Sequence, residues 1–165
     1  MEVLGTADGW HLEARCTDHS CLPVMVPTRP GLGEQALPTV TQDPPWSVDG
    51  VALKALLLVD LDGDTKPELR VDWRSVGVPR AAVGSWHRDF TTVLDPSTGA
   101  LRLNVETGSF GGASEVHCAG TLVFDATGAT LERQCQLNAC RVGGAMPGEC
   151  EEGPTEETRR LVWLR

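Results

Sequence analysis

Three short turns, each set between two apolar or alternating runs, constrain the fold of this chain more than any other feature. They are the acidic stretch 60–67, the stretch Asp95-Pro96-Ser97-Thr98-Gly99 and the stretch Asp125-Ala126-Thr127-Gly128. Aspartate, proline and glycine favour tight turns, because proline presets φ and glycine accepts a positive φ. Residues 51–59 before the first turn are mostly apolar, as in a central strand, whereas residues 68–74 after it alternate, as in a strand with one wet face. The pattern predicts β-hairpins.

The other two turns extend this pattern along the chain. The second joins residues 89–94 to residues 100–105, the third joins residues 121–124 to residues 129–132, and residues 161–164 are typical of a closing strand. Helical patterns are weak, since no segment has a strong apolar period. The segments that can hold short helical turns are residues 4–12, 78–86 and 151–160. We predict a mainly β fold, an antiparallel sandwich or barrel built from hairpins.

The N-terminal part differs from the rest in its proline content. Six prolines and two glycines lie between Pro23 and Pro45, and proline hinders both sheet ladders and helices. A chain of 165 residues is within the usual size of one domain. We therefore expect a single domain, residues 1–165, with three parts: a disulfide-bearing element (1–22), an extended Pro-rich arm or long loop laid against the domain (23–49) and a β core (50–165).

Six cysteines lie in two clusters, and none shows the Cys-x-x-Cys or Cys/His spacing of a zinc site. An even count without that spacing favours disulfides and hence an oxidising compartment. Six cysteines allow about fifteen pairings. Proximity suggests the pairs Cys16–Cys21, Cys118–Cys135 and Cys140–Cys150. Cys16, His19 and Cys21 are also an alternative soft-metal site, but no fourth ligand lies nearby.

The middle pair depends on hairpin register. A two- or four-residue loop within 125–128 puts Cys118 opposite Cys135, whereas a three-residue loop offsets them by one residue, onto opposite faces of the sheet. The sequence leaves this turn, and so the pairing, open.

Charge and hydropathy exclude several classes of partner. The chain carries a net charge of -9 and has no basic run, whereas nucleic acids and anionic membranes attract basic faces. The longest apolar run, residues 55–59, is far shorter than the ~20 residues that span a bilayer. We therefore expect no nucleic-acid partner and no transmembrane segment.

The first ten residues show neither the basic start nor the apolar core of a secretory signal. Together with the cysteines, this predicts a mature domain whose signal has been removed. We expect it to be secreted, periplasmic or lipid-anchored at the cell surface.

The first turn carries the strongest chemical signal. It places four carboxylates at alternating spacing: Asp60, Asp62, Asp64 and Glu68. Carboxylates crowded this closely repel one another unless a cation neutralises them, and hard oxygen ligands suit calcium. The competing explanation is an acidic turn that serves only solubility. We predict a Ca²⁺ site here.

Residues 60–69, Asp-Leu-Asp-Gly-Asp-Thr-Lys-Pro-Glu-Leu, resemble the calcium loop of FG-GAP or VCBS repeats, in which Asp-x-Asp-Gly-Asp-Gly-x-x-Asp-Leu lies between two strands. The resemblance implies calcium ligation by the side chains of Asp60, Asp62, Asp64 and Glu68 and by the carbonyl of Lys66. Thr65 stands where the motif has glycine, and Glu68 where it has aspartate. The chain holds one such stretch, whereas a propeller needs several. The EF-hand pattern fits less well, because its sixth and twelfth positions fall on Thr65 and Val71.

We favour an extracytoplasmic calcium-binding β-domain that acts as a binding or protein-interaction module for a protein or polysaccharide partner. A secreted hydrolase is one alternative. The chain has the histidines His11, His19, His87 and His117 but no Gly-x-Ser-x-Gly elbow, and a glycosidase-like carboxylate pair stays open because the separations are unknown.

A carbohydrate-binding module is the other alternative. Five tryptophans without a tyrosine can stack on sugars if two or three are exposed together, although tryptophan more often packs in a core. They are Trp10, Trp46, Trp73, Trp86 and Trp163. Trp46, beside two prolines in the arm, is the best candidate for exposure.

Overall fold

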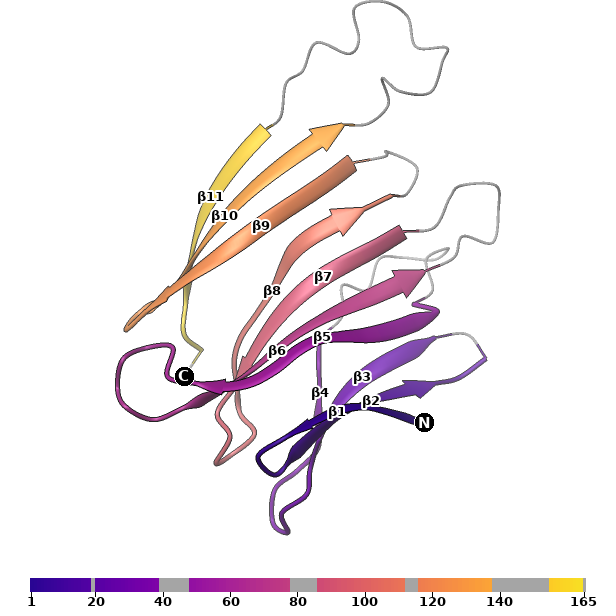
Figure 1. Cartoon of the computed structure of the whole chain (residues 1–165), viewed down its shortest axis with the longest axis vertical. Coiled ribbons are helices and arrows are strands. Elements are labelled where there is room, and N and C mark those ends of the chain that lie inside the picture. The colour runs from indigo at the N-terminus through magenta and orange to yellow at the C-terminus, as the bar shows by residue number, and fades with distance from the viewer. Residues whose placement is uncertain (19, 39–47, 78–85, 112–115, 138–154, 165) are drawn as a thin grey trace, which may run out of the picture.

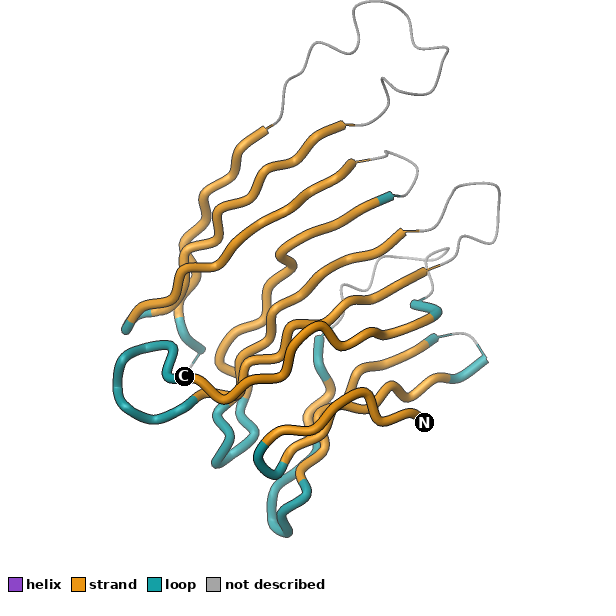
Figure 2. The backbone as a smooth tube through the Cα atoms, in the orientation of Figure 1, coloured by secondary structure: helices purple, strands orange, loops and turns teal. Residues whose placement is uncertain are grey.

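The computed structural model describes residues 1–18, 20–38, 48–77, 86–111, 116–137 and 155–164. Every regular element among them is a β-strand, and the strands pair antiparallel in two sheets (Figures 1 and 2). The predicted mainly β fold is therefore confirmed. The helical turns considered for residues 4–12 and 155–160 are wrong, because these residues lie in hairpin strands. Residues 78–85 and 151–154 lie outside the described residues.

The two sheets differ in size. The smaller sheet has the strand order β1-β2-β3-β4 and consists of β1 (Glu2–Ala7), β2 (Trp10–Cys16), β3 (Cys21–Pro27) and β4 (Gln35–Ala36). The larger sheet has the order β11-β10-β9-β8-β7-β6-β5 and consists of β5 (Gly50–Val59), β6 (Glu68–Gly77), β7 (Trp86–Leu94), β8 (Leu101–Phe110), β9 (Val116–Asp125), β10 (Gly128–Leu137) and β11 (Thr155–Val162). Within the described chain β5 and β11 end the larger sheet, so it is not a closed barrel.

The three predicted hairpins form around the predicted turns. β5 and β6 flank the acidic loop, β7 and β8 flank the second turn, and β9 and β10 flank the third. In the second and third turns, an aspartate accepts the backbone N–H two residues on. Asp95 Oδ1 accepts from Ser97 (2.7 Å), and Asp125 Oδ1 accepts from Thr127 (2.8 Å). These local hydrogen bonds explain why the turn residues alone were enough to locate the hairpins.

Two of the three predicted disulfides are confirmed. Cys16 and Cys21 close the β2–β3 hairpin. Cys118 bridges to Cys135 because Asp125 pairs with Gly128 across a two-residue loop, which sets these two cysteines directly opposite each other. The third predicted pair, Cys140–Cys150, lies outside the described residues.

The prediction of residues 51–59 as a central strand is wrong, because β5 is an edge strand of the larger sheet. A register shift between Leu53 and Ala55 marks a β-bulge at Lys54. Before the bulge Leu53 lies opposite Trp73, and after it Leu56 lies opposite Val71. The bulge thus moves the inward face from odd-numbered to even-numbered residues. Apolar and polar residues therefore do not alternate regularly along residues 51–59, and the sequence of this segment resembles that of a strand buried on both faces.

The prediction of a Pro-rich arm is also wrong for residues 23–27 and 35–36, which belong to β3 and β4. Pro23 accepts a hydrogen bond from Leu37 through its carbonyl, and Cys21 N–H donates to Val48. The backbone N–H and C=O groups of the odd-numbered residues of β3 therefore point away from β2, toward β4. Proline is tolerated in β3 because its missing N–H points to this side, where β4 is two residues long. Residues 39–47 of the arm lie outside the described residues.

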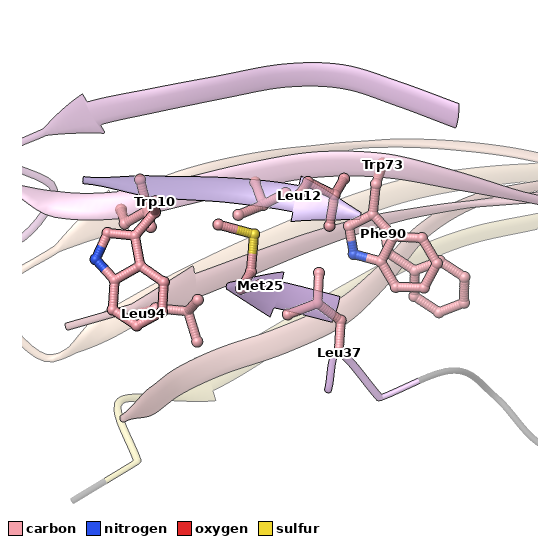
Figure 3. Packing of buried hydrophobic residues seen from close by; sticks show 9 residues of the cluster. Trp10, Leu12, Met25, Leu37, Trp73, Phe90 and Leu94 are labelled. Carbon is pink, nitrogen blue, oxygen red and sulfur yellow. The ribbon is translucent and has the colours of Figure 1, made fainter. Parts of the chain in front are cut away.

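The main core lies between the two sheets, as in a sandwich (Figure 3). Its buried members come from strands of both sheets and from Leu37, which directly follows β4: Trp10, Leu12, Met25, Leu37, Leu69, Val71, Trp73, Phe90 and Leu94. Trp73 stacks on Phe90 with ring centroids 4.4 Å apart, and its indole N–H donates to Thr92 Oγ1 (3.0 Å). The indole N–H of Trp73 therefore has a hydrogen-bond acceptor although the ring is buried.

A second core covers the opposite face of the larger sheet. Its buried members are Val93, Leu103, Val105, Ala129 and Leu131. β8 and β9 pair only at Gly108–Ala119 and Ser109–Cys118. Along the rest of their length these strands diverge, which lets β10 pack its apolar side chains against those of β7 and β8. Both faces of β7 are therefore buried near its end, since adjacent residues of a strand point to opposite faces.

Candidate metal centre

The acidic loop connects β5 to β6 and is held by its own aspartates. Both carboxylate oxygens of Asp60 accept backbone N–H groups, from Gly63 (2.7 Å) and Thr65 (3.0 Å). Asp62 accepts from Asp64 N–H (3.1 Å) in the same manner. These local hydrogen bonds curve the backbone of the loop around the side chains of Asp60 and Asp62 and hold the two carboxylates in place.

Two loop residues have a left-handed backbone. Gly63 has φ of 79° and Thr65 has φ of 73°. Thr65 is a non-glycine residue in a backbone conformation that glycine adopts most readily. A β-branched residue at positive φ is strained by roughly 1 to 2 kcal/mol.

The loop brings three carboxylates together. One oxygen each of Asp60, Asp62 and Glu68 lies within 4.8 Å of the other two. Two oxygens on opposite sides of one Ca²⁺ ion are about 5 Å apart, twice the usual Ca–O distance. A single cation can therefore contact all three residues. Asp64 lies in the same loop but outside this group, and it accepts the N–H of Lys66 (2.8 Å).

Glu68 is the buried member of the cluster, with 2% of its surface exposed. Burial raises the pKa of its carboxyl, and the negative charges of Asp62 and Asp64 add to this effect. A hydrogen bond from Leu61 N–H to Oε2 (2.8 Å) and the charge of Arg102 oppose it. The ionised form is poorly solvated, so Glu68 gains more from a nearby cation than an exposed carboxylate does.

Arg102 of β8 is the cluster's internal counterion. Its guanidinium donates to Glu68 Oε1 (3.2 Å) and to Asp62 Oδ2 (3.4 Å), and it lies over the ring of Trp163 at 5.0 Å. This one guanidinium leaves the carboxylates of Asp60, Asp62 and Glu68 with an excess of negative charge, and Asp64 in the same loop adds to it. A bound cation would offset that excess.

The sequence reasoning missed Arg102. It lies 34 residues from Glu68 and 40 from Asp62, so no local spacing connects them. The contact exists because the first and second hairpins are neighbours in the sheet. The C-terminal end lies beside the same site, since Leu164 N–H donates to the Arg102 carbonyl (2.8 Å) (Figure 1).

The histidines considered for a hydrolase do not converge on a nucleophile in the described chain. His87 stacks on Phe110 with centroids 5.3 Å apart, and His117 meets the same ring edge-on at 5.5 Å. His11 contacts Glu13 (2.8 Å). Burial lowers the pKa of His87, and the positive charge of Arg74 lowers it further. Among the described residues, His87 and His117 thus pack on one aromatic ring, that of Phe110. His19 lies outside the described residues.

The tryptophans form no exposed stacking platform in the described chain. Trp10, Trp73 and Trp86 are buried. Trp163 is half-buried, lies parallel to the ring of Phe124 and donates its indole N–H to the Asp125 carbonyl (3.1 Å). Trp46, the candidate for exposure, lies outside the described residues.

A polar cleft of about 330 Å³ is lined by residues of β5, β6 and β7 on one side and of β8 and β9 on the other. Its charged groups pair with one another. Asp89 accepts two hydrogen bonds from Arg74 (2.6 and 2.9 Å) and one from Lys54 (3.2 Å). Burial disfavours the ionised form of Asp89, but these hydrogen bonds outweigh burial and keep the pKa of its carboxyl below the usual value. The carboxylate is thus already neutralised, unlike those of the acidic loop.

Comparison of the chain with protein-family models, with curated proteins and with solved structures gives no match. The described part of the chain contains no helix with the length and apolar character that crossing a bilayer requires.

Proposed function

We propose that this chain is an extracytoplasmic calcium-binding β-domain that acts as a binding or protein-interaction module. Asp60, Asp62 and Glu68 hold the ion, and Asp64 and the carbonyl of Lys66 complete the ligand set. The observation that carries the proposal is the gathering of three carboxylates within 4.8 Å of one another, one of them buried.

The donor chemistry favours calcium over other divalent ions. All candidate ligands are oxygens, which disfavours zinc and copper relative to hard cations. Magnesium demands a near-ideal octahedron and keeps several waters, whereas calcium accepts irregular sets of six to eight oxygens. The two disulfides support an oxidising compartment. Extracellular calcium modules work with dissociation constants on the order of 10⁻⁴ to 10⁻³ M, and we expect this range here.

Calcium has a structural role in this proposal. The ion neutralises the repulsion that Glu68 feels from its acidic neighbours and ties the start of β6 to the loop. Arg102 then links the same carboxylates to β8 and to the C-terminal end. Bound calcium would thus rigidify one end of the larger sheet as a surface for a partner.

Thermal unfolding with and without calcium tests the proposal. A ligand at 100 times its dissociation constant stabilises by about 2.7 kcal/mol. For a chain of this length, that raises the midpoint by roughly 5 to 11 °C relative to a chelator. Asp60→Asn is expected to weaken the response. Asp95→Asn, which alters a turn aspartate outside the cluster, is the matched control and should keep it.

Isothermal titration supplies the second measurement. We expect saturable heat from Ca²⁺ in wild type and in Asp95→Asn, and a reduced affinity in Asp60→Asn. Absence of heat together with an unchanged midpoint would reject calcium binding and leave the loop as an acidic surface turn.

A further inference from the structure

The outer edge of β11 is a regular strand edge. β11 pairs with β10 at eight consecutive positions without a bulge, and it contains neither proline nor lysine. No strand of the described chain pairs on its other side. An edge with these properties is a template for pairing with another chain, because its outward backbone groups lack partners in the sheet.

The opposite edge of the same sheet is protected. β5 carries a bulge with a lysine, Lys54, and β1 packs closely against it: a side chain on Gly5 would meet Leu53 at 2.2 Å. Bulges, prolines, charged side chains (lysine above all) and covering segments are the usual means of preventing edge pairing. β11 has no bulge, proline or lysine, and no described residue covers its outer edge. Its four charged residues are of both signs, so they repel a second strand only in some registers.

The ladder with β10 determines which backbone groups of β11 face outward. Trp163 N–H donates to the Thr127 carbonyl before β10, whereas the next N–H, that of Leu164, turns away. Backbone groups of an antiparallel strand alternate between its two sides. Odd-numbered residues of β11 therefore face β10, and the even-numbered Glu156, Thr158 and Arg160 present their N–H and C=O groups to the open edge.

The charged side chains of β11 are arranged so that two antiparallel copies of the strand would be complementary in charge. The central residues are Glu156-Glu157-Thr158-Arg159-Arg160. In an antiparallel pair of two copies centred on Thr158, each glutamate lies directly opposite an arginine of the second copy. This register also matches outward backbone groups with outward backbone groups. The neighbouring registers centre on Glu157 or Arg159 and place like charges opposite each other, which is destabilising.

Glu157 and Arg159, which lie on the same face of β11, can each contact a residue of a second copy. Arg159 is exposed and has no hydrogen bond or ion pair with any described residue. Glu157 pairs with Arg133 of β10 (2.6 Å), yet its side chain is 40% exposed and can accept a second guanidinium. Glu156 and Arg160 already have partners within the chain, so their contribution is smaller.

We propose that β11 is a homodimerisation edge. Two copies pair antiparallel through β11 about a two-fold axis at Thr158, so that their larger sheets become continuous. Such an interface is isologous, since the two-fold axis brings the same strand of both copies together. It does not involve the acidic loop and holds whether or not the loop binds calcium.

Analytical ultracentrifugation of charge variants tests the register. Wild type, loaded from about 1 to about 300 μM, is expected to associate with a dissociation constant on the order of 10⁻⁵ M, about −7 kcal/mol, as in a weak interface. Arg159→Glu sets glutamates opposite Glu157 twice, and Glu157→Arg sets arginines opposite Arg159 twice. Each variant alone should weaken dimerisation at least about tenfold, because like charges across an interface are repulsive.

Mixing the two variants gives the decisive result. In the mixed dimer the glutamate introduced by Arg159→Glu in one copy meets the arginine introduced by Glu157→Arg in the other. The native pair forms on the other side of the axis, so association should return. Glu157→Arg also loses the contact with Arg133, so its folding is checked by circular dichroism. A wild type that stays monomeric throughout, or variants that dimerise as wild type does, would overturn the proposal.

Cysteine cross-linking tests the axis independently. Paired residues that share hydrogen bonds across antiparallel strands have Cα atoms about 5.5 Å apart, a separation that suits a disulfide. Thr158→Cys is expected to give a covalent dimer under mild oxidation. The control Val123→Cys is 59% exposed on β9, away from the edge, and should give none beyond the wild-type background. Equal yields for both variants would argue against the edge.

Discussion

The acidic loop and the turn that begins at Asp125 contain similar residues but have opposite electrostatics. Asp125 is exposed, and Arg160 donates to both of its carboxylate oxygens (2.6 and 2.7 Å). The hydrogen bonds from Arg160 and Thr127 hold the pKa of Asp125 below its usual value. Glu68 is buried among other carboxylates, and its pKa is raised. The carboxylate of Asp125 is therefore neutralised by Arg160 of β11, whereas the carboxylates of the acidic loop outnumber their one guanidinium, that of Arg102.

The largest expected difference between the two regions is their response to calcium. Glu68→Gln keeps the shape of the side chain but removes its charge, so the calcium stabilisation of about 2.7 kcal/mol should be lost. Asp125→Asn should leave it intact. Thermal midpoints in calcium and in chelator check both variants. A calcium response retained in Glu68→Gln would contradict the ligand set, because the buried carboxylate is its central member.

The second expected effect concerns the internal counterions. Arg102→Met leaves buried Glu68 without its guanidinium, and we expect a loss of about 2 to 3 kcal/mol in chelator. Calcium should restore part of this loss, because the ion replaces the missing positive charge. Arg160→Met at the exposed turn should cost less and show no calcium rescue. Urea unfolding at both calcium levels measures this. Equal losses in calcium and in chelator would mean that Arg102 and the ion do not share the carboxylates.

A smaller effect is a pH dependence of opposite sign at the two carboxyls. The pKa of Asp125 lies below the ordinary 3.8, so its stabilisation is present above pH 3.8 and is lost as the pH falls further. The pKa of Glu68 lies above the ordinary 4.5, so without metal its ionisation costs stability as the pH rises through and above 4.5.

Thermal melts in chelator measure this difference. At about pH 7 in chelator, Glu68→Gln should melt at a higher temperature than wild type, because it lacks the costly charge. This difference in melting temperature should narrow as the pH falls from about 7 to about 4. The gap between Asp125→Asn and wild type should persist over that range and narrow only below pH 3.8. A pH-independent gap for Glu68→Gln would show that the Glu68 carboxyl is not destabilised in its ionised form.

The smallest effect concerns the backbone of the acidic loop. Thr65→Asn keeps a polar side chain while relieving the positive-φ strain, and we expect a gain of up to about 1 kcal/mol. Thr98→Asn, in the second turn but without positive φ, is the control and should give no gain. Urea unfolding resolves the two. A loss of stability in Thr65→Asn would mean that the threonine hydroxyl or methyl makes a contact worth more than the strain.

Local chemistry made much of the fold predictable from the sequence. Turn aspartates bond to backbone groups two residues away, so the positions of the hairpins follow from neighbouring residues. The sequence left the Cys118–Cys135 register open, and the two-residue loop between Asp125 and Gly128 decided it. The edge position of β5 was not predictable, because the bulge at Lys54 changes the phase of the apolar pattern. Proline content likewise suggested a loop where β3 forms, since the sequence does not show which side of a strand lacks a partner.

The sequence by itself determined which carboxylates lie in one loop, because residues spaced by two along a tight turn cannot be far apart. Only the tertiary structure decided that Glu68 is buried, that Asp64 lies outside the closest group and that Arg102 shares the site. It also decided that, in the described chain, both β5 and β11 end the larger sheet, β5 with a bulge and β11 with a regular ladder. The physical reason is the same in each case. Burial, counterions and free edges depend on which strands become neighbours, and that depends on packing across the whole sheet.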